Sequence, residues 1–266
     1  MDAMVQSAAD DGVAPKAPAR SGGVQSVERV FELMETIADA GGEISLSDLA
    51  AASNLPLPTI HRLLRTLVSL GYARQLPSRR YALGPRLIRL GEQAGKQLGT
   101  LAGPVLEHLV RELGETSNLA MLDGDGAVYV AQRPSPHAMR MFTEVGRRVH
   151  LHNTGVGKAL LSTMTDDEVA RLIERTGMPP RTPKSLTTLP ELLADLATIR
   201  EQGYAVDDEE QELGVRCYAV PIPGEGARVA LSVSGPLARV DLRFAARALP
   251  VLRAGAERLG VELARG

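Results

Sequence analysis

The sequence predicts an α+β protein in which a winged helix-turn-helix precedes a larger domain with an antiparallel sheet flanked by helices. Three observations predict this fold class. Apolar residues recur at helical spacing from about residue 26 to residue 71, and a two-stranded hairpin pattern follows. Short alternating segments joined by a glycine-rich turn begin at residue 119. Helical and strand patterns are then interspersed after residue 155.

Composition excludes several classes of protein. The chain has 266 residues, 44% of them hydrophobic, with 30 basic and 32 acidic side chains, which suits two soluble domains. No apolar run approaches the ~20 residues of a spanning helix, and the first residues lack a secretion signal, so we expect a cytoplasmic protein without membrane contact. With one cysteine, Cys217, no internal disulfide is expected. We expect no cofactor and no metal, since His150 and His152 alone make a weak ligand set.

The first 84 residues predict a tail followed by the winged unit. Residues 1–22 are rich in Ala, Pro, Gly and Asp and predict a disordered tail. Residues 23–84 predict the winged helix-turn-helix, in which the spacing of Ser45 and Asp48 is typical of a helix-capping pair. Its predicted elements are a helix over 26–39, a short helix between Ser45 and Asn54, a third helix between Pro56 and Gly71, and strands at 72–75 and 80–83.

Charge placement within this unit predicts DNA binding. Between Leu57 and Leu90 there are seven arginines and no acidic residue, whereas an even spread would put about four acids there. The polar side of the third helix could enter a major groove, where arginine bonds guanine, and arginines at the hairpin tip suit the minor groove or backbone. The predicted DNA contacts are Pro58, Thr59, His61, Arg62, Arg65, Arg79 and Arg80. For each residue alone, a merely solvated helix face is the alternative.

Four spaced motifs occur in order along the chain: LPLPTIHRLL at 55–64, TGVGKA at 154–159, GYAVDDEE at 203–210 and ALSVSGP at 230–236. Together they resemble the IclR family of bacterial transcriptional regulators. The resemblance covers about residues 25–262. It implies a winged helix that binds operator DNA, a linker helix, a C-terminal GAF-like domain that binds a small effector, and assembly as a homodimer or dimer of dimers. Leu57 departs from the family pattern, since many relatives carry a basic residue near this position.

The remaining chain predicts a linker and the C-terminal domain. Residues 85–100 predict a glycine-interrupted linker helix, and Gly103-Pro104 is predicted to separate it from a helix over 104–114. The C-terminal domain is predicted over 101–266, and residues 139–145 could extend its sheet. The other predicted elements are strands at 119–122, 127–131, 204–207, 215–222 and 227–234 and helices at about 155–164, 166–176, 189–202 and 240–263.

Two segments of this domain suit a small polar ligand. Residues 153–158 lie where a loop becomes a helix, so glycines and backbone N–H groups there would accept an anion, with Gly155 and Val156 as predicted contacts. Ser232 and Ser234 alternate with aliphatic residues, which places both hydroxyls on one face of a strand. The alternative is that these serines bond only neighbouring backbone or water.

The resemblance adds Asp207 and Cys217 to the effector-binding residues. Asp207 opens a run with five carboxylates between residues 207 and 212, and we expect Asp207 to point inward and most of the others outward. Cys217 could instead be a nucleophile, but nothing nearby in the sequence supplies a base. Core packing is a further alternative for a lone cysteine.

These inferences predict a sequence-specific DNA-binding regulator and not an enzyme. We expect a repressor of a catabolic pathway whose operator affinity changes when a small carboxylate or carbonyl metabolite binds the C-terminal domain. An activator of the same family is one alternative. At greater distance, the alternatives are an enzyme that uses Cys217 or the acidic run, and a protein-interaction module that uses its helices for assembly without reading DNA sequence. Within the family, residues 139–142 and the two strand serines allow an allantoin- or glyoxylate-type pathway.

Overall fold

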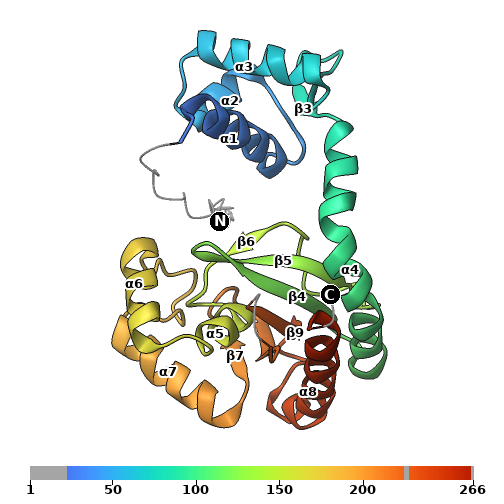
Figure 1. The fold of residues 1–266 in the computed structure, drawn as a ribbon, viewed down its shortest axis with the longest axis vertical. Coiled ribbons are helices and arrows are strands. Elements are labelled where there is room, and N and C mark those ends of the chain that lie inside the picture. The colour runs from blue at the N-terminus through green and yellow to red at the C-terminus, as the bar shows by residue number, and fades with distance from the viewer. Residues whose placement is uncertain (1–22, 225–227, 265–266) are drawn as a thin grey trace, which may run out of the picture. The chain divides into compact units, whose positions relative to one another are not determined.

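The computed structural model describes residues 23–224 and 228–264, and of residues 95–98 only the backbone. The tail predicted over residues 1–22 lies outside the described residues. The described chain divides into two compact units, one ending at residue 97 and one beginning at residue 98 (Figure 1). Each unit is built around a hydrophobic interior of its own.

The described part of the N-terminal unit contains three short helices and a small antiparallel sheet in the order β1-β3-β2. The third helix packs its apolar stripe inward, and Ser45 caps the second helix by accepting the N–H of Asp48, as predicted. The winged helix-turn-helix is therefore confirmed, with β1 as an additional two-residue strand too short to show any alternation. The elements are α1 (Gln25–Asp39), β1 (Glu43–Ile44), α2 (Leu46–Ser53), α3 (Leu57–Leu70), β2 (Ala73–Gln75) and β3 (Tyr81–Leu83).

The next helix runs without interruption through a position where the sequence predicted a break. Helix α4 (Arg86–Leu113) contains Gly103 and Pro104 in its interior. Proline cannot donate to the carbonyl four residues earlier, and its ring crowds the preceding turn. The turn after it nevertheless buries Val105 and Leu106 in the core of the C-terminal unit, and burial of apolar surface offsets the lost hydrogen bond. The two helices predicted on either side of Pro104 are one.

The C-terminal unit is a six-stranded antiparallel sheet in the order β6-β5-β4-β9-β8-β7, with helices on both faces (Figure 1). Helix α8 and the last turns of α4 cover one face, whereas α5, α6 and α7 cover the other. The predicted α+β fold class is confirmed. The elements are β4 (Thr116–Asp123), β5 (Gly126–Arg133), β6 (Arg148–Val149), α5 (Gly155–Leu161), α6 (Asp166–Thr176), α7 (Leu189–Gln202), β7 (Ala205–Asp208), β8 (Val215–Pro221), β9 (Val229–Pro236) and α8 (Leu242–Leu263).

Residues 139–145 form no strand, contrary to the prediction. The strand that pairs with the outer side of β5 is β6, after this segment. The apolar side chains of Met139, Phe142 and Val145 are 73%, 66% and 59% exposed, so the segment buries no apolar face that would favour a strand. It forms instead a loop whose polar groups reach back to β4 and β5.

Replacing Pro104 with alanine tests the continuity of α4. The new N–H can bond the carbonyl four residues earlier, and we expect the free energy of unfolding to rise by about 1–3 kcal/mol. The control is Pro190→Ala, because Pro190 lies in the first turn of α7, where a missing N–H costs nothing. Guanidinium denaturation followed by circular dichroism measures both. An equal gain at Pro190 contradicts the interpretation.

Candidate functional site

The outward side of α3 carries most of the residues predicted to contact DNA. Four of the predicted residues on this helix are exposed and one is half-buried: Pro58, His61, Arg62, Arg65 and Thr59. The opposite side of the helix is core. Neither the Arg62 nor the Arg65 guanidinium bonds another described residue. The helix therefore presents two uncompensated positive charges on a polar face.

The tip of the hairpin presents one arginine and holds the other. Arg79 is exposed at the turn, with a φ of 63°, a conformation that non-glycine residues adopt mainly in tight turns. Arg80 donates from Nη2 to the Glu43 carbonyl at 2.9 Å, and its Nε lies 3.2 Å from Glu43 Oε1. The pairing of β1 with β3 brings this acid beside a sequence window that has none. Arg79 is thus the more available of the two.

In the C-terminal unit, strand pairing places polar side chains in two adjacent rows on the face that α5 covers. The first row crosses β7, β8, β9 and β4 through Asp207, Cys217, Ser234 and Thr116. In the second row, Ser232 lies opposite Asn118. Because residues two apart on a strand share a face, both rows point the same way. The remaining elements of this face contribute apolar packing, so the rows form a polar island between sheet and helix.

Two atoms of this island are buried without a hydrogen-bond partner. Ser232 and Asn118 are each 0% exposed, and no nitrogen or oxygen of a described residue pairs with Ser232 Oγ or Asn118 Nδ2. The Cys217 thiol lies near the Ser232 hydroxyl, and the hydroxyls of Ser234 and Ser232 lower the pKa of that thiol against the larger effect of burial, but sulfur is a weak hydrogen-bonding partner. The other end of the Asn118 amide is occupied, since Thr143 Oγ1 donates to its Oδ1 at 2.6 Å. Buried polar groups in native proteins nearly always have a partner. These two are therefore the atoms of the island best placed to bind a ligand or ordered water.

Gly155 brings the backbone of α5 onto the first row. A Cβ at this position would lie 2.8 Å from Cys217 Sγ and 3.3 Å from its Cβ. The sequence-predicted contacts Gly155, Cys217 and Ser234 are thus brought together. Val156 is fully buried among the apolar residues of α5 to α7. Because α5 has seven residues and not the ten predicted, its dipole is small, and the close backbone approach is the main contribution of the glycine.

The ionisable groups of the first row favour their neutral forms. Burial, with a contribution from Glu210, raises the pKa of Asp207 to about 7. Burial and then the neighbouring Asp207 raise the pKa of Cys217 to about 12. A protonated thiol is a poor nucleophile, which does not suit the alternative of a Cys217 enzyme. Asp207, by contrast, can accept or donate a proton near neutral pH.

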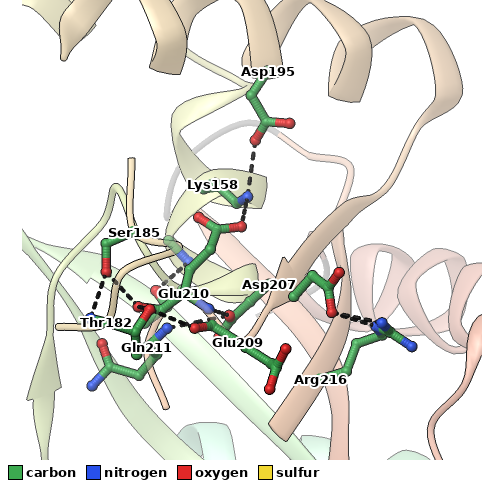
Figure 2. Close-up of polar contacts among 12 residues, drawn as sticks. Lys158, Thr182, Ser185, Asp195, Asp207, Glu209, Glu210, Gln211 and Arg216 are labelled. Carbon is green, nitrogen blue, oxygen red and sulfur yellow. Dashed lines mark hydrogen bonds and ion pairs between the residues drawn. The ribbon is translucent and has the colours of Figure 1, made fainter. Parts of the chain in front are cut away.

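The carboxylates after Asp207 do not all point outward. Glu210 is only 8% exposed and is an exception to the expected outward orientation of most of this run, whereas Asp207 is buried as expected. Its side chain is bound by Lys158, which is itself buried and also pairs with Asp195 of α7 (Figure 2). Lys158 follows the predicted turn and was passed over because lysine is rarely buried unless paired. Its partners come from segments that the sequence does not place beside it.

Asn118 and Thr143 were also missed by the sequence analysis. The strand β4 begins at Thr116, three residues earlier than predicted. Thr116, Ser117 and Asn118 are all polar, so this stretch has no alternation of polar and apolar residues that could have indicated a strand. Thr143 lies in the loop mistaken for a strand.

Outside the two rows, the described part of the chain contains no group of three or more His, Cys, Asp or Glu side chains that could hold a metal ion. No described helix is long and apolar enough to cross a membrane. A surface hollow of about 220 Å³ at the start of α8 is lined by Arg239, Asp241, Arg243, Phe244 and Arg247, none of which belongs to the predicted site.

Comparison with known proteins identifies relatives over most of the chain. Residues 94–261 match the family model described as bacterial transcriptional regulator IclR C-terminal, and residues 26–77 match the IclR helix-turn-helix domain. The transcriptional repressor IclR of Escherichia coli (strain K12) is 37% identical over 231 residues, which is 84% of each chain. The acetate operon repressor of Salmonella typhimurium is 36% identical over 245 residues, 89% of each. The Thermotoga maritima IclR structure has a TM-score of 0.71 at 26% identity, covering 90% of this chain and 99% of that one.

A double-mutant cycle tests the contact between α5 and the polar row. Gly155→Ala is expected to lower the free energy of unfolding by about 1–3 kcal/mol, because its methyl group overlaps Cys217 Sγ. In a Cys217→Ala background the obstructing sulfur is absent, and the cost should fall by at least ~0.5 kcal/mol. Urea denaturation of the four proteins gives the coupling. Strict additivity would show that the helix and strand are not in contact.

Proposed function

The chain belongs to the IclR family of bacterial transcriptional regulators, and on that premise we propose that it is a transcriptional repressor controlled by a small carboxylate or carbonyl metabolite. Its N-terminal unit binds double-stranded operator DNA in a sequence-specific manner, and its C-terminal unit binds the metabolite. It works in the cytoplasm as a homodimer or dimer of dimers, since two recognition helices on one symmetric protein match two half-sites on DNA.

The exposed side of α3 supports the DNA-binding part of the proposal. Arg62 and Arg65 lie three residues apart on the outward face, and neither guanidinium bonds another described residue. In a major groove, a guanidinium in this position forms a forked bond with guanine O6 and N7. Pro58, Thr59 and His61 begin the same face, and Arg79 extends from the wing. Arg80 contributes charge while Glu43 holds it in place.

The effector-binding part rests on Ser232 Oγ and Asn118 Nδ2, which are fully buried, lie opposite each other in the strand register and have no nitrogen or oxygen partner among the described residues. The amide nitrogen is a donor, and a hydroxyl can donate or accept. Ser234 and a protonated Asp207 add donors in the neighbouring row. Such a cluster of hydrogen-bond donors suits the oxygens of a small carboxylate or carbonyl compound. Gly155, Val156 and Cys217 form the surrounding wall.

Repression is relieved by linkage between the two sites. A ligand that favours an arrangement unsuited to the operator lowers DNA affinity, and DNA lowers ligand affinity by the same factor, with typical couplings of 1–3 kcal/mol. The names of two relatives, a repressor and an acetate operon repressor, support repression over activation and a pathway of carboxylate metabolism. An allantoin- or glyoxylate-type pathway is the specific version that we propose for test.

Substituting the two free arginines tests the recognition helix. Arg62→Ala and Arg65→Ala are each expected to weaken binding to a duplex from upstream of the protein's own gene by roughly 5- to 150-fold, the equivalent of about 1–3 kcal/mol. The control Arg171→Ala removes an exposed arginine from α6 and should leave the affinity unchanged. Fluorescence anisotropy at several salt concentrations measures all four proteins. Unchanged operator affinity in both α3 variants would refute the assignment.

The pH dependence of ligand binding tests the participation of Asp207. An anion bound beside this carboxyl favours its protonated form, so binding takes up a proton above the pKa of about 7 in the free protein. Glyoxylate affinity, measured by calorimetry, should therefore fall as pH rises through 7, by up to about tenfold per unit. Below that pH it should be level.

Asp207→Asn provides the control for this dependence. The amide keeps an oxygen for the N–H groups of Glu210 and Gln211 but does not titrate, so the affinity should become independent of pH between 6 and 8.5. A profile that falls equally in the wild type and the variant would assign the titration to another group.

A further inference from the structure

Lys158 is a buried lysine three residues after Gly155. Its side chain is 2% exposed, and its Nζ lies 2.5 Å from Glu210 Oε1 and 2.9 Å from Asp195 Oδ2 (Figure 2). One ammonium therefore joins α5, α7 and the segment that follows β7. Burial lowers the pKa of Lys158, but the two carboxylates more than offset this, and the net pKa is raised. The side chain stays charged at neutral pH and acts as a fixed cation.

The main chain of Glu210 is held as firmly as its side chain. Its N–H donates to Asp207 Oδ1 at 2.8 Å, and the N–H of Gln211 donates to the same oxygen at 3.3 Å. The Glu210 carbonyl accepts a hydrogen bond from Ser185 Oγ at 2.6 Å and another from Thr182 Oγ1 at 3.3 Å (Figure 2). Glu210 thus connects Lys158 on one side with Asp207 on the other.

This connection ends at the polar island. Asp207 lies opposite Cys217 in the first row, and no described residue bonds its second oxygen. The titratable groups that interact electrostatically with Asp207 include Glu210 from its own loop, Lys158 from α5, Cys217 from β8 and Tyr129 from β5. Of these only Lys158 is a cation. The orientation of the Asp207 carboxyl is therefore set by the two backbone N–H groups that Lys158 anchors through Glu210.

Stability alone is a weak reason for such a cluster. Removing the Lys158 ammonium and the Glu210 carboxylate from water costs several kcal/mol per ion, and apolar replacements of buried ion pairs are often equally stable or more so. The third member, Asp195, keeps 35% of its side chain exposed. What an apolar cluster does not provide is a charge that directs one carboxylate, and with it one stretch of main chain, to a single position. The geometry here supplies that direction.

We infer that Lys158 is a positioning residue of the ligand site: by pairing with Glu210 and Asp195 it holds residues 210 and 211 so that their N–H groups fix the carboxyl of Asp207 in one orientation. The inference rests on the proposed function, because Asp207 is taken there as part of the effector site. Lys158 itself has no need to touch the ligand. Specificity for a small oxygen-bearing ligand then depends on a residue outside the polar rows.

Hydrogen exchange of the full-length protein without ligand tests the anchoring step. Lys158→Met removes the ammonium and keeps the chain length, and the amides of peptide 207–213 are expected to exchange at least about tenfold faster than in the wild type. Lys184→Met is the matched control, because Lys184 is half-exposed and pairs with the adjacent Glu209. It should exchange like the wild type. A folded Lys158→Met variant with wild-type exchange overturns the proposal.

Glyoxylate binding tests the positioning step, with Glu210→Gln as a second variant of nearly the same shape as the wild-type side chain. Glu210→Gln keeps a hydrogen-bond acceptor for Lys158 but removes the negative charge beside Asp207, so the pH at which affinity begins to fall should move to a lower value. Lys158→Met should weaken glyoxylate binding about tenfold or more at pH 6.5, and Lys184→Met should change neither quantity. The proposal is overturned if Glu210→Gln shows the wild-type pH dependence of glyoxylate affinity. It is also overturned if Lys158→Met exchanges its 207–213 amides faster than the wild type but binds glyoxylate with wild-type affinity.

The two experiments separate this inference from the proposed function. If the wild type fails to bind glyoxylate, the proposed effector is wrong, and the exchange experiment still decides whether Lys158 anchors residues 210 and 211. If glyoxylate binds but Lys158→Met changes neither exchange nor affinity, the effector site stands and the positioning role is wrong.

Discussion

The register of four antiparallel strands is the constraint on which the rest of this structure depends. Pairing of β7, β8, β9 and β4 aligns Asp207, Cys217, Ser234 and Thr116 in one row and Ser232 with Asn118 in the next. A one-residue shift in the pairing register of β9 would turn Ser232 and Ser234 toward α8 and would turn the aliphatic residues of β9 toward α5. The apolar core between the sheet and α8 prevents this slip. Packing on one face of the sheet therefore fixes the chemistry of the other.

Buried polarity on that face is accommodated in two different ways. Lys158 is charged and balanced by two carboxylates, whereas Asp207 lies where burial and a neighbouring carboxylate make its neutral form accessible near pH 7. Ser232 and Asn118 are neither charge-balanced nor titratable near neutral pH, and each keeps one buried atom without a nitrogen or oxygen partner among the described residues. In a well-packed interior such atoms cost about 1–3 kcal/mol each. A site that binds a ligand is where this cost is useful, because binding recovers it.

Sequence reasoning succeeded where periodicity or local chemistry decides the structure. The apolar stripe of α3, the Ser45 cap and the shared face of Ser232 and Ser234 are all local patterns. It failed where a distant segment decides. Pro104 stays helical because the following turn packs into a core whose other residues come much later in the chain. Glu210 turns inward because it pairs with Lys158, which lies 52 positions earlier in the sequence. Asn118 lies in the first part of β4, which the sequence did not predict as strand because a short polar stretch does not define where a strand begins. From the sequence, Arg80 is expected to have no acidic partner, but the pairing of β1 with β3 brings Glu43 beside it.

We propose that a small oxygen-bearing metabolite binds at the unpartnered atoms of Ser232 and Asn118. A crystal structure of the protein grown with glyoxylate, at a resolution that separates ligand from water, tests this most directly. We expect ligand oxygens within hydrogen-bonding distance of Ser232 Oγ and Asn118 Nδ2, between the sheet and the backbone of α5 at Gly155. Ordered water alone on both atoms, with the ligand bound at another place on the protein, would contradict it.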